Sequence, residues 1–267
     1  MTDAPSRSGP LAGLRVFDLT RVLAGPTCVQ MLGDLGAEVI KIERPGAGDD
    51  TRGFAPPYWP GTKESAYFLG VNRNKQSVTL DIAKPEGQRL ALALIAKSDI
   101  LVENFKVGAL AKYGLGYEQL SQKFPKLVYC SITGFGQTGP YAPRPGYDGL
   151  IQGFGGIMSL TGEPEGMPMK VGVPVADLFA GLYGCIGVLA ALRHAEATGI
   201  GQHVDIGMLD THLAWLANQA MNYLSTNENP ARLGNDHPNI VPYQVFATAD
   251  GHMMLSIGND PTFAKFC

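Results

Sequence analysis

Short apolar runs alternate with helical patterns along most of this 267-residue chain, and this alternation is the strongest constraint on its fold. The first apolar run covers 14–19, and a helix is predicted to begin at Pro26, a residue favoured in a first helical turn. Gly36 follows at a position typical of a helix end, and a second apolar run covers 39–42. Strand, helix and strand in this order predict a βαβ unit with parallel strands.

The same alternation continues beyond the first unit. Further strands are predicted at 77–82, 100–103, 127–132 and 204–206, and helices at 85–97, within 107–124, from about Asp177 and at 208–224. Strands that alternate with helices predict an α/β fold, here a Rossmann-like, mostly parallel sheet with helices on both faces. Ligands of such sheets bind at the carboxyl ends of the strands, so we expect the site there.

The chain is expected to contain one large domain and part of a second, smaller one. Residues 1–10 are polar, lack the apolar segment of a secretory signal, and are predicted to be a disordered lead-in. The large domain is expected over 11–226. The remaining 227–267 begin with a polar connector, and 253–257 are predicted to be the first strand of the small domain.

Charge and composition exclude several classes of protein. The 21 basic and 24 acidic residues give a net charge of -3, so no overall basic field attracts nucleic acid or an anionic membrane. The four cysteines form no CxxC pair, which disfavours a zinc site and a disulfide framework and favours a reducing, cytoplasmic location. The apolar stretch 171–192 is interrupted by Pro174 and Asp177, so we predict a buried core helix rather than a membrane span.

Standard cofactor and hydrolase motifs are absent from the sequence. Glu43 ends the second predicted strand, where an NAD-binding protein places its ribose-binding acid, but residues 23–28 (LAGPTC) lack the GxGxxG fingerprint. A helix N-terminus at this turn can still hold a phosphate. There is no P-loop, GxSxG or HExxH motif, and the five histidines are scattered, so no metal is predicted.

Asp177 is the most informative single residue. It lies in the segment VGVPVADLFAG (171–181), at the start of a helix that is apolar on all sides. An aspartate there can cap the helix, because its charge suits the positive end of the helix dipole. It can also be a desolvated carboxylate that attacks an activated acyl group. The local sequence alone favours capping and leaves both hypotheses open.

Six segments, taken together, carry a resemblance to a known family. They are DLTRVLAGP (18–26), GDLGAEVIKIERP (33–45), VNRNKQS (71–77), VENF (102–105), SITGFGQTGP (131–140) and the residues 172–181 around Asp177. In this order they resemble the family III coenzyme A transferases, which include formyl-CoA:oxalate transferase, carnitine CoA-transferase and the alpha-methylacyl-CoA racemases. The resemblance favours catalysis over capping for Asp177.

The resemblance implies a role for specific residues. Asp177 matches the catalytic aspartate that carries the acyl group as an anhydride and then CoA as a thioester. The implied CoA contacts are Val22, Leu23, Ala24, Arg44, Leu80, Asn104 and Lys112, and the implied acyl-pocket residues are Tyr147 and Asp148. Acyl-CoA and a small carboxylic acid are then the substrates, and no permanently bound cofactor is expected.

Departures from the family pattern narrow the substrate. Leu23 stands where oxalate-using members carry glutamine, and Tyr147 stands where racemases carry a histidine that acts as acid or base. Residues 46–52 and 71–75 look most like the succinyl-CoA:glutarate type, which predicts a dicarboxylic acid. An acyl-CoA racemase or isomerase and a non-catalytic, shortened CoA-binding form are the alternatives. Family members are longer and interlock in pairs, so we expect a homodimer for the full-length form and a C-terminally shortened second domain here.

Overall fold

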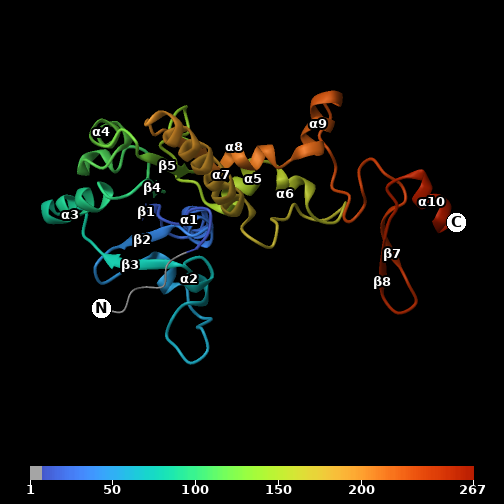
Figure 1. Cartoon of the computed structure of the whole chain (residues 1–267). Coiled ribbons are helices and arrows are strands. Elements are labelled where there is room, and N and C mark those ends of the chain that lie inside the picture. The colour runs from blue at the N-terminus through green and yellow to red at the C-terminus, as the bar shows by residue number, and fades with distance from the viewer. Residues whose placement is uncertain (1–7) are drawn as a thin grey trace. The chain divides into compact units, whose positions relative to one another are not determined.

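A six-stranded parallel sheet forms the centre of the computed structural model, which describes residues 8–267 (Figure 1). In spatial order its strands are β3 (Lys75–Thr79), β2 (Glu38–Glu43), β1 (Arg15–Asp18), β4 (Ile100–Glu103), β5 (Val128–Thr133) and β6 (His203–Gly207). All neighbouring strands pair in parallel. The predicted α/β fold is confirmed. The strand order reverses between β1 and β4, which places a crevice at their carboxyl ends.

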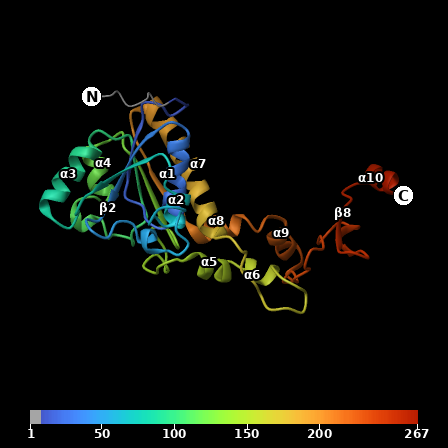
Figure 2. The same cartoon turned by 90° about the horizontal axis from the view of Figure 1, so that it is seen from below.

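Helices cover both faces of the sheet. α1 (Ala24–Asp34) and α7 (Val175–Thr198) lie on one face, and α3 (Pro85–Ile95) and α4 (Tyr117–Lys123) lie on the other (Figures 1 and 2). Successive side chains of a strand point to opposite faces, so Val16 joins the core under α1 while its neighbour Phe17 joins the core under α3. Both side chains are fully buried. The continuous apolar runs of the strands follow from burial on two sides.

α7 packs tightly against α1 through glycine. A Cβ atom on Gly181 would lie 2.7 Å from the backbone oxygen of Ala24, so only glycine allows this approach of the two helices. α7 is long and apolar enough to cross a membrane by length and composition. However, residues spaced along it, among them Ala180, Val188 and Leu192, belong to the core over the sheet. This packing is that of a core helix of an α/β domain, as the sequence predicts.

Several shorter elements lie between and after the strands of the sheet. They are η1 (Asp50–Gly53), α2 (Ala66–Gly70), η2 (Ala111–Tyr113), α5 (Asp148–Phe154), α6 (Ile157–Leu160), α8 (Met208–Ala214) and α9 (Ala217–Thr226). The helix predicted over 208–224 is two helices, and Ala217 at the start of the second has a positive φ of 46°. The lead-in predicted over 1–10 lies mostly outside the described residues.

The chain forms two compact units whose boundary differs from the expected one at residue 226. The first contains the residues up to Ile151 together with Pro174–Trp215, and the second contains Gln152–Val173 and Leu216–Cys267. Within the second unit Arg232 donates hydrogen bonds to the backbone oxygens of Glu163 and Gly166. These contacts join segments almost 70 residues apart, which explains why local composition does not reveal the division.

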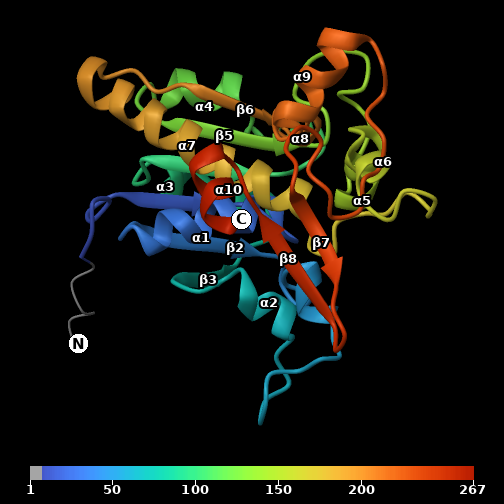
Figure 3. The same ribbon diagram turned by 90° about the vertical axis from the view of Figure 1, so that its right-hand side faces the viewer.

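The second unit contains an antiparallel pair of strands, β7 (Tyr243–Ala247) and β8 (His252–Ser256), followed by α10 (Asp260–Phe266) (Figure 3). β8 lies within one residue of the predicted strand. β7 is absent from the prediction, because the polar connector before it masks the start of its short alternating pattern.

Candidate active site

A cleft of about 460 Å³ lies at the carboxyl edge of the sheet, where the strand order reverses. Its walls are formed mainly by the turn from β1 into α1, the loop after β4, the end of β5 with the loop after it, and the first turn of α7, with Asp50 of η1 and Met208 of α8. The lining residues that carry the argument are Arg21, Val22, Leu23, Ala24, Asn104, Phe105, Arg144, Tyr147 and Asp177. The fold therefore brings together residues that lie more than 150 positions apart.

Asp177 reaches this cleft from the third position of α7. Gly181 lies one turn further along the same helix face and touches Ala24, so the close crossing of α7 and α1 brings Asp177 beside the turn that leads into α1. Burial, and after it the nearby charge of Asp148, raises the pKa of the Asp177 carboxyl to about 7. Among residues 8–267, no cation forms an ion pair with Asp177.

The cap of α7 is supplied by another residue. The N-cap position is Pro174, which offers no side-chain acceptor. The Asp148 carboxylate accepts hydrogen bonds from the backbone N–H groups of Ala176, at 2.9 Å, and of Asp177, at 3.4 Å. These are the two donors that an N-cap side chain normally satisfies. Capping is therefore a function of Asp148, which the local sequence hypothesis assigned to Asp177.

The turn between β1 and α1 is held by two side chains from elsewhere. The Asn104 amide accepts from the Arg21 N–H at 2.9 Å and donates to the Arg21 carbonyl at 2.7 Å. The Asp49 carboxylate accepts from the Val22 N–H at 3.3 Å. Val22 has a φ of +71°, which is strained for a β-branched residue and costs about 1–3 kcal/mol. Only surrounding contacts of this kind keep such a conformation populated.

The strained turn opens α1 towards the cleft. No side chain caps α1 at Leu23, and its first turn contains no acidic residue. The first N–H groups of a helix lack partners within the helix and carry partial positive charge. Leu23 and Ala24 therefore present donors suited to a phosphate or to an oxygen that gains negative charge.

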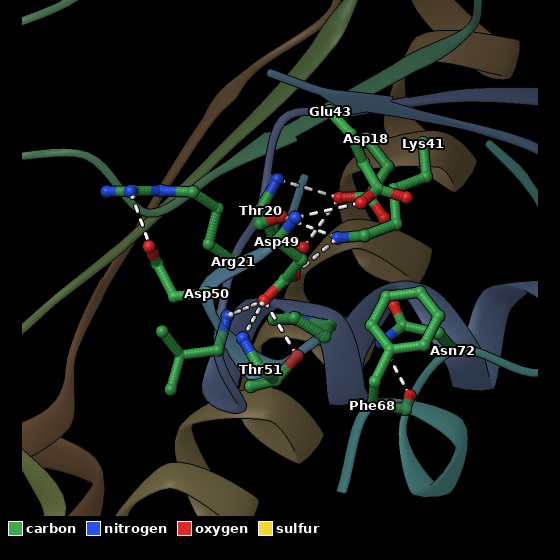
Figure 4. A network of polar contacts seen from close by, with 12 residues as sticks. Asp18, Thr20, Arg21, Lys41, Glu43, Asp49, Asp50, Thr51, Phe68 and Asn72 are labelled. Carbon is green, nitrogen blue, oxygen red and sulfur yellow. Dashed lines mark hydrogen bonds and ion pairs between the residues drawn. The ribbon is translucent and has the colours of Figure 1, made fainter. Parts of the chain in front are cut away.

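A buried network of charges supports Asp49 (Figure 4). Lys41 Nζ lies 2.9 Å from Asp49 Oδ2 and donates to the Thr20 carbonyl at 2.8 Å. The other oxygen of Asp49 accepts from the backbone N–H and the hydroxyl of Thr51. Burial opposes the charge on Asp49, but Lys41 and these hydrogen bonds lower its pKa below the ordinary value. Behind them Lys75 Nζ lies 3.4 Å from Asp18.

Glu43, at the end of β2, belongs to the same supporting structure. Its carboxylate accepts two hydrogen bonds from Arg52, at 2.7 and 2.8 Å, and one from the Ser77 hydroxyl at 2.6 Å. Burial opposes ionisation, yet these donors lower the pKa of Glu43 to about 2. The Glu43 carboxylate is thus occupied by contacts within the protein, which does not favour a role for Glu43 as a ribose-binding acid.

A second, smaller cleft of about 210 Å³ adjoins the first. Arg21 and Phe105 line both clefts, so the two are neighbours separated by these side chains. The Arg21 guanidinium lies over the Phe105 ring, 5.2 Å from its centre, and pairs with Asp50 at 3.0 Å. Asp50 also pairs with Arg44 at 2.9 Å. The Asp50 carboxylate thus pairs with both Arg21 and Arg44, and both arginines line the smaller cleft.

The residues expected to contact CoA divide between the two clefts. Val22, Leu23, Ala24 and Asn104 line the larger one, and Arg44 and Leu80 line the smaller one. Lys112 lines neither, but its Nζ lies 4.7 Å from the ring centre of Tyr113, which lines the smaller cleft. Of the two acyl-pocket residues, Tyr147 lines the larger cleft and Asp148 does not. Their roles towards a ligand stay predictions.

Sequence reasoning missed Arg21, Phe105 and Asp49. Arg21 and Phe105 lie inside the quoted segments DLTRVLAGP and VENF, and each follows a strand at its carboxyl end. Position after a strand is the signal that could have found them. Asp49 lies in a Gly-rich loop, and its contact with Val22 spans 27 residues.

The loop over 135–145 forms one wall of the larger cleft and is closed at its neck by two glycines. A Cβ on Gly134 would lie 2.5 Å from the Cα of Gly146, so the two backbones touch where the loop leaves and rejoins the fold. Inside the loop the Arg144 guanidinium lies 4.4 Å from the ring centre of Tyr141. Arg144 is a third arginine on the walls of the clefts.

The fold and the site define a class: an α/β protein with a crevice at the switch point of its sheet, lined by a desolvated carboxylate and by the N-terminus of a helix. Residues 11–267 match the family model described as CoA-transferase family III, and the chain belongs to this family. The predicted resemblance is thereby confirmed.

Named relatives agree with this family. The chain is 54% identical over 271 residues to the succinate–glutarate CoA-transferase of Agrobacterium fabrum, covering 100% of the chain and 68% of that protein. It is 47% identical to the succinyl-CoA:glutarate CoA-transferase of Mus musculus, covering 97% of the chain and 59% of that protein. A CAIB/BAIF family protein from Brucella suis has the same fold, with a TM-score of 0.89, 52% identity, and coverage of 97% and 69%. The chain thus spans 59–69% of the length of these three proteins.

Proposed function

We propose that the protein moves CoA from an acyl-CoA to a carboxylic acid, with Asp177 as the covalent nucleophile. The observation that carries this proposal is the position of Asp177: a carboxylate with no cationic partner among the described residues, on the wall of a cleft that also contains the uncapped N-terminus of α1. A desolvated carboxylate with a pKa near 7 is more basic than an ordinary one and is therefore a stronger nucleophile.

The first half of the reaction transfers CoA to Asp177. The carboxylate attacks the carbonyl carbon of the donor thioester, the carbon–sulfur bond breaks, and CoA thiolate leaves a mixed aspartyl–acyl anhydride. The thiolate then attacks the aspartyl carbonyl of this anhydride. The donor acid departs as a carboxylate, and Asp177 becomes an aspartyl–CoA thioester.

The second half reverses these steps with the acceptor acid. The incoming carboxylate attacks the aspartyl thioester, CoA thiolate leaves, and a new anhydride forms. Thiolate attack on the acyl carbonyl of the acceptor yields the product thioester and restores the Asp177 carboxylate. No water, redox partner or net proton enters the balance, so exclusion of water preserves the energy of the thioester. The partly buried position of Asp177 favours this exclusion.

The two clefts fit the two ends of an acyl-CoA. Arg21 and Arg44 beside the smaller cleft offer charge to phosphates, and Leu80 and Phe105 offer apolar surface to the adenine end. The larger cleft then holds the thioester between the start of α1 and Asp177. A dicarboxylic acyl group, such as succinyl or glutaryl, is supported by the names of the two relatives.

Racemisation, the alternative within the family, is not favoured by the cleft. A racemase needs an acid and a base on opposite sides of the α carbon. No histidine lines the larger cleft among the described residues, and Tyr147, at the position of the racemase histidine, is 72% exposed. The transferase therefore stays the preferred function.

Replacement of Asp177 by asparagine tests the proposal. Asp177→Asn preserves side-chain size and removes the nucleophile, so transfer from succinyl-CoA to glutarate should fall on the order of 10³-fold or more, while CoA binding persists. Mass spectrometry of the wild-type chain with succinyl-CoA should find the adduct on Asp177. The matched control is Asp99→Asn. Asp99 accepts a hydrogen bond from the backbone N–H of Arg15 at the amino ends of the central strands, away from the cleft at their carboxyl ends. Undiminished transfer by Asp177→Asn, with no deamidation by mass, would contradict the mechanism.

A further inference from the structure

Asp148 is a charged side chain that accepts a hydrogen bond from the backbone of the proposed nucleophile. It opens α5, yet its carboxylate bonds to the first turn of α7, 28 residues further along the chain. The same oxygen, Oδ1, accepts from Ala176 and Asp177. The carboxylate that caps the helix is thus fixed within hydrogen-bonding distance of the residue whose side chain faces the cleft.

This arrangement places the carboxyl groups of Asp148 and Asp177 at the same helix turn, where their charges repel each other. A cap is expected to be anionic, because the helix N-terminus stabilises negative charge. A second carboxylate on the same turn then meets the repulsion of the first, which favours its protonated form. Burial and the charge of Asp148 act in the same direction on Asp177 and raise its pKa to about 7.

Groups on the neighbouring elements do not cancel this repulsion. His212 on α8 is completely buried, and burial lowers its pKa although Asp148 acts against this, which disfavours a positive charge on its imidazole. Tyr67 on α2 has its pKa raised by burial and then by Asp177, Asp148 and Asp49, so its phenol also stays neutral. Asp49 adds negative charge on the side of η1 but is neutralised by Lys41.

We propose that Asp148 is a positioning residue that acts on Asp177 in two ways: it fixes the first turn of α7 as a cap, and it holds a negative charge beside the Asp177 carboxylate. This inference rests on the proposed function of Asp177. It concerns the contact of Asp148 with the backbone of Asp177 and is separate from the predicted place of Asp148 in the acyl pocket.

The two effects can be separated by substitution. Asp148→Asn retains an acceptor oxygen for Ala176 and Asp177 but removes the charge, whereas Asp148→Ala removes both. Asp99→Asn is the matched control. It too removes one charge from a carboxylate that accepts a backbone N–H, but at the amino ends of the strands.

The primary measurement does not depend on activity. Carbodiimide couples protonated carboxyls to an amine, and mass spectrometry quantifies coupling at Asp177 as a function of pH in the full chain. We expect a midpoint near pH 7 for the wild type and for Asp99→Asn, and a midpoint lower by roughly 0.5–1.5 pH units for Asp148→Asn. An unchanged midpoint in Asp148→Asn would overturn the proposal.

Kinetics supply the second measurement. For succinyl-CoA the rise of kcat/KM with pH should move to lower pH in Asp148→Asn by the same amount, with the plateau lowered roughly 3–10-fold because the carboxylate is less basic. Asp148→Ala should lose more. A variant that merely unfolds would lower activity at all pH values without moving the profile, which would count against the proposal. If the wild type transfers no CoA, the proposed function fails, while the labelling midpoints still decide the role of Asp148.

Discussion

Two kinds of carboxylate line the clefts, Glu43 and Asp49 in the smaller one and Asp177 in the larger one, and they differ in whether a cation is paired with them. Glu43 and Asp49 are neutralised by Arg52 and Lys41, and their pKa values are lowered. Asp177 has no cation beside it among the described residues, and its pKa is raised. The paired carboxylates hold the strained turn before α1. Under the proposed function Asp177 is the group that reacts, so the difference in pairing separates the carboxylates that position the site from the carboxylate that reacts.

Breaking a pair in the supporting network should have the largest effect on stability. Asp49→Ala leaves the Lys41 ammonium buried, with a single carbonyl partner, and frees the strained Val22 from its hydrogen bond. We expect a loss of about 3–5 kcal/mol in the free energy of unfolding, measured by urea denaturation. Asp34→Ala, which breaks the exposed pair with Arg73, is the control and should cost about 0–1 kcal/mol. Equal losses in both variants would show that the network is not supporting the fold.

The pH dependence of stability should have opposite signs in the two groups. The folded-state pKa of Asp177 is above the unfolded value, so the wild type loses stability as the pH rises from about 4 through 7. Asp177→Asn lacks this loss, and its Tm relative to the wild type should rise over that range by about 2–4 °C for each kcal/mol removed. Differential scanning calorimetry at pH 4, 5.5 and 7.5 measures the difference.

Glu43→Gln gives the opposite test in the same experiment. The folded-state pKa of Glu43, about 2, is below the unfolded value, so its stabilisation is complete above the unfolded pKa and is lost as the pH falls towards 2. Glu43→Gln should therefore be less stable than the wild type at neutral pH, and the gap should close in acid. If the stability of both variants relative to the wild type changed with pH in the same direction, the two groups of carboxylates would not differ in the way described.

The smallest effect on stability is expected at the mouth of the smaller cleft. Arg44 is more than half exposed and shares Asp50 with Arg21, so Arg44→Gln should change the free energy of unfolding by less than about 0.5 kcal/mol. If Arg44 contacts a phosphate of CoA, KM for succinyl-CoA should rise roughly 3–10-fold at constant kcat. Arg73→Gln, outside both clefts, is the control. A fall in kcat with constant KM would place Arg44 in the chemistry instead.

The sequence predicts the sheet well because its signals are local. The βαβ unit over 14–42 and the strand over 100–103 are found because apolar runs, Pro26 and Gly36 determine their structure without distant contacts. The helix predicted over 208–224 is interrupted in the structure, because Ala217 has a positive φ. No glycine or proline at this position indicates the interruption in the sequence.

The site is harder to predict because its decisive contacts are distant. Asp177 is identified through the family resemblance, whereas its local pattern favours a cap. The true cap, Asp148, and the clamp of Asn104 on Arg21 connect residues 28 and 83 positions apart, and no spacing rule connects them. The expected homodimer and cytoplasmic location stay predictions.

The contact between Gly134 and Gly146 at the base of the loop over 135–145 makes the length and sequence of this loop easy to change. Since the two ends of the loop touch, residues can be inserted or lost between them with little cost in chain entropy and no shift of β5. The wall of the cleft that carries Arg144 can thus vary independently of Asp177 on α7. Under the proposed function, exchange of this one loop would change which acid is accepted and leave the chemistry at Asp177 unchanged.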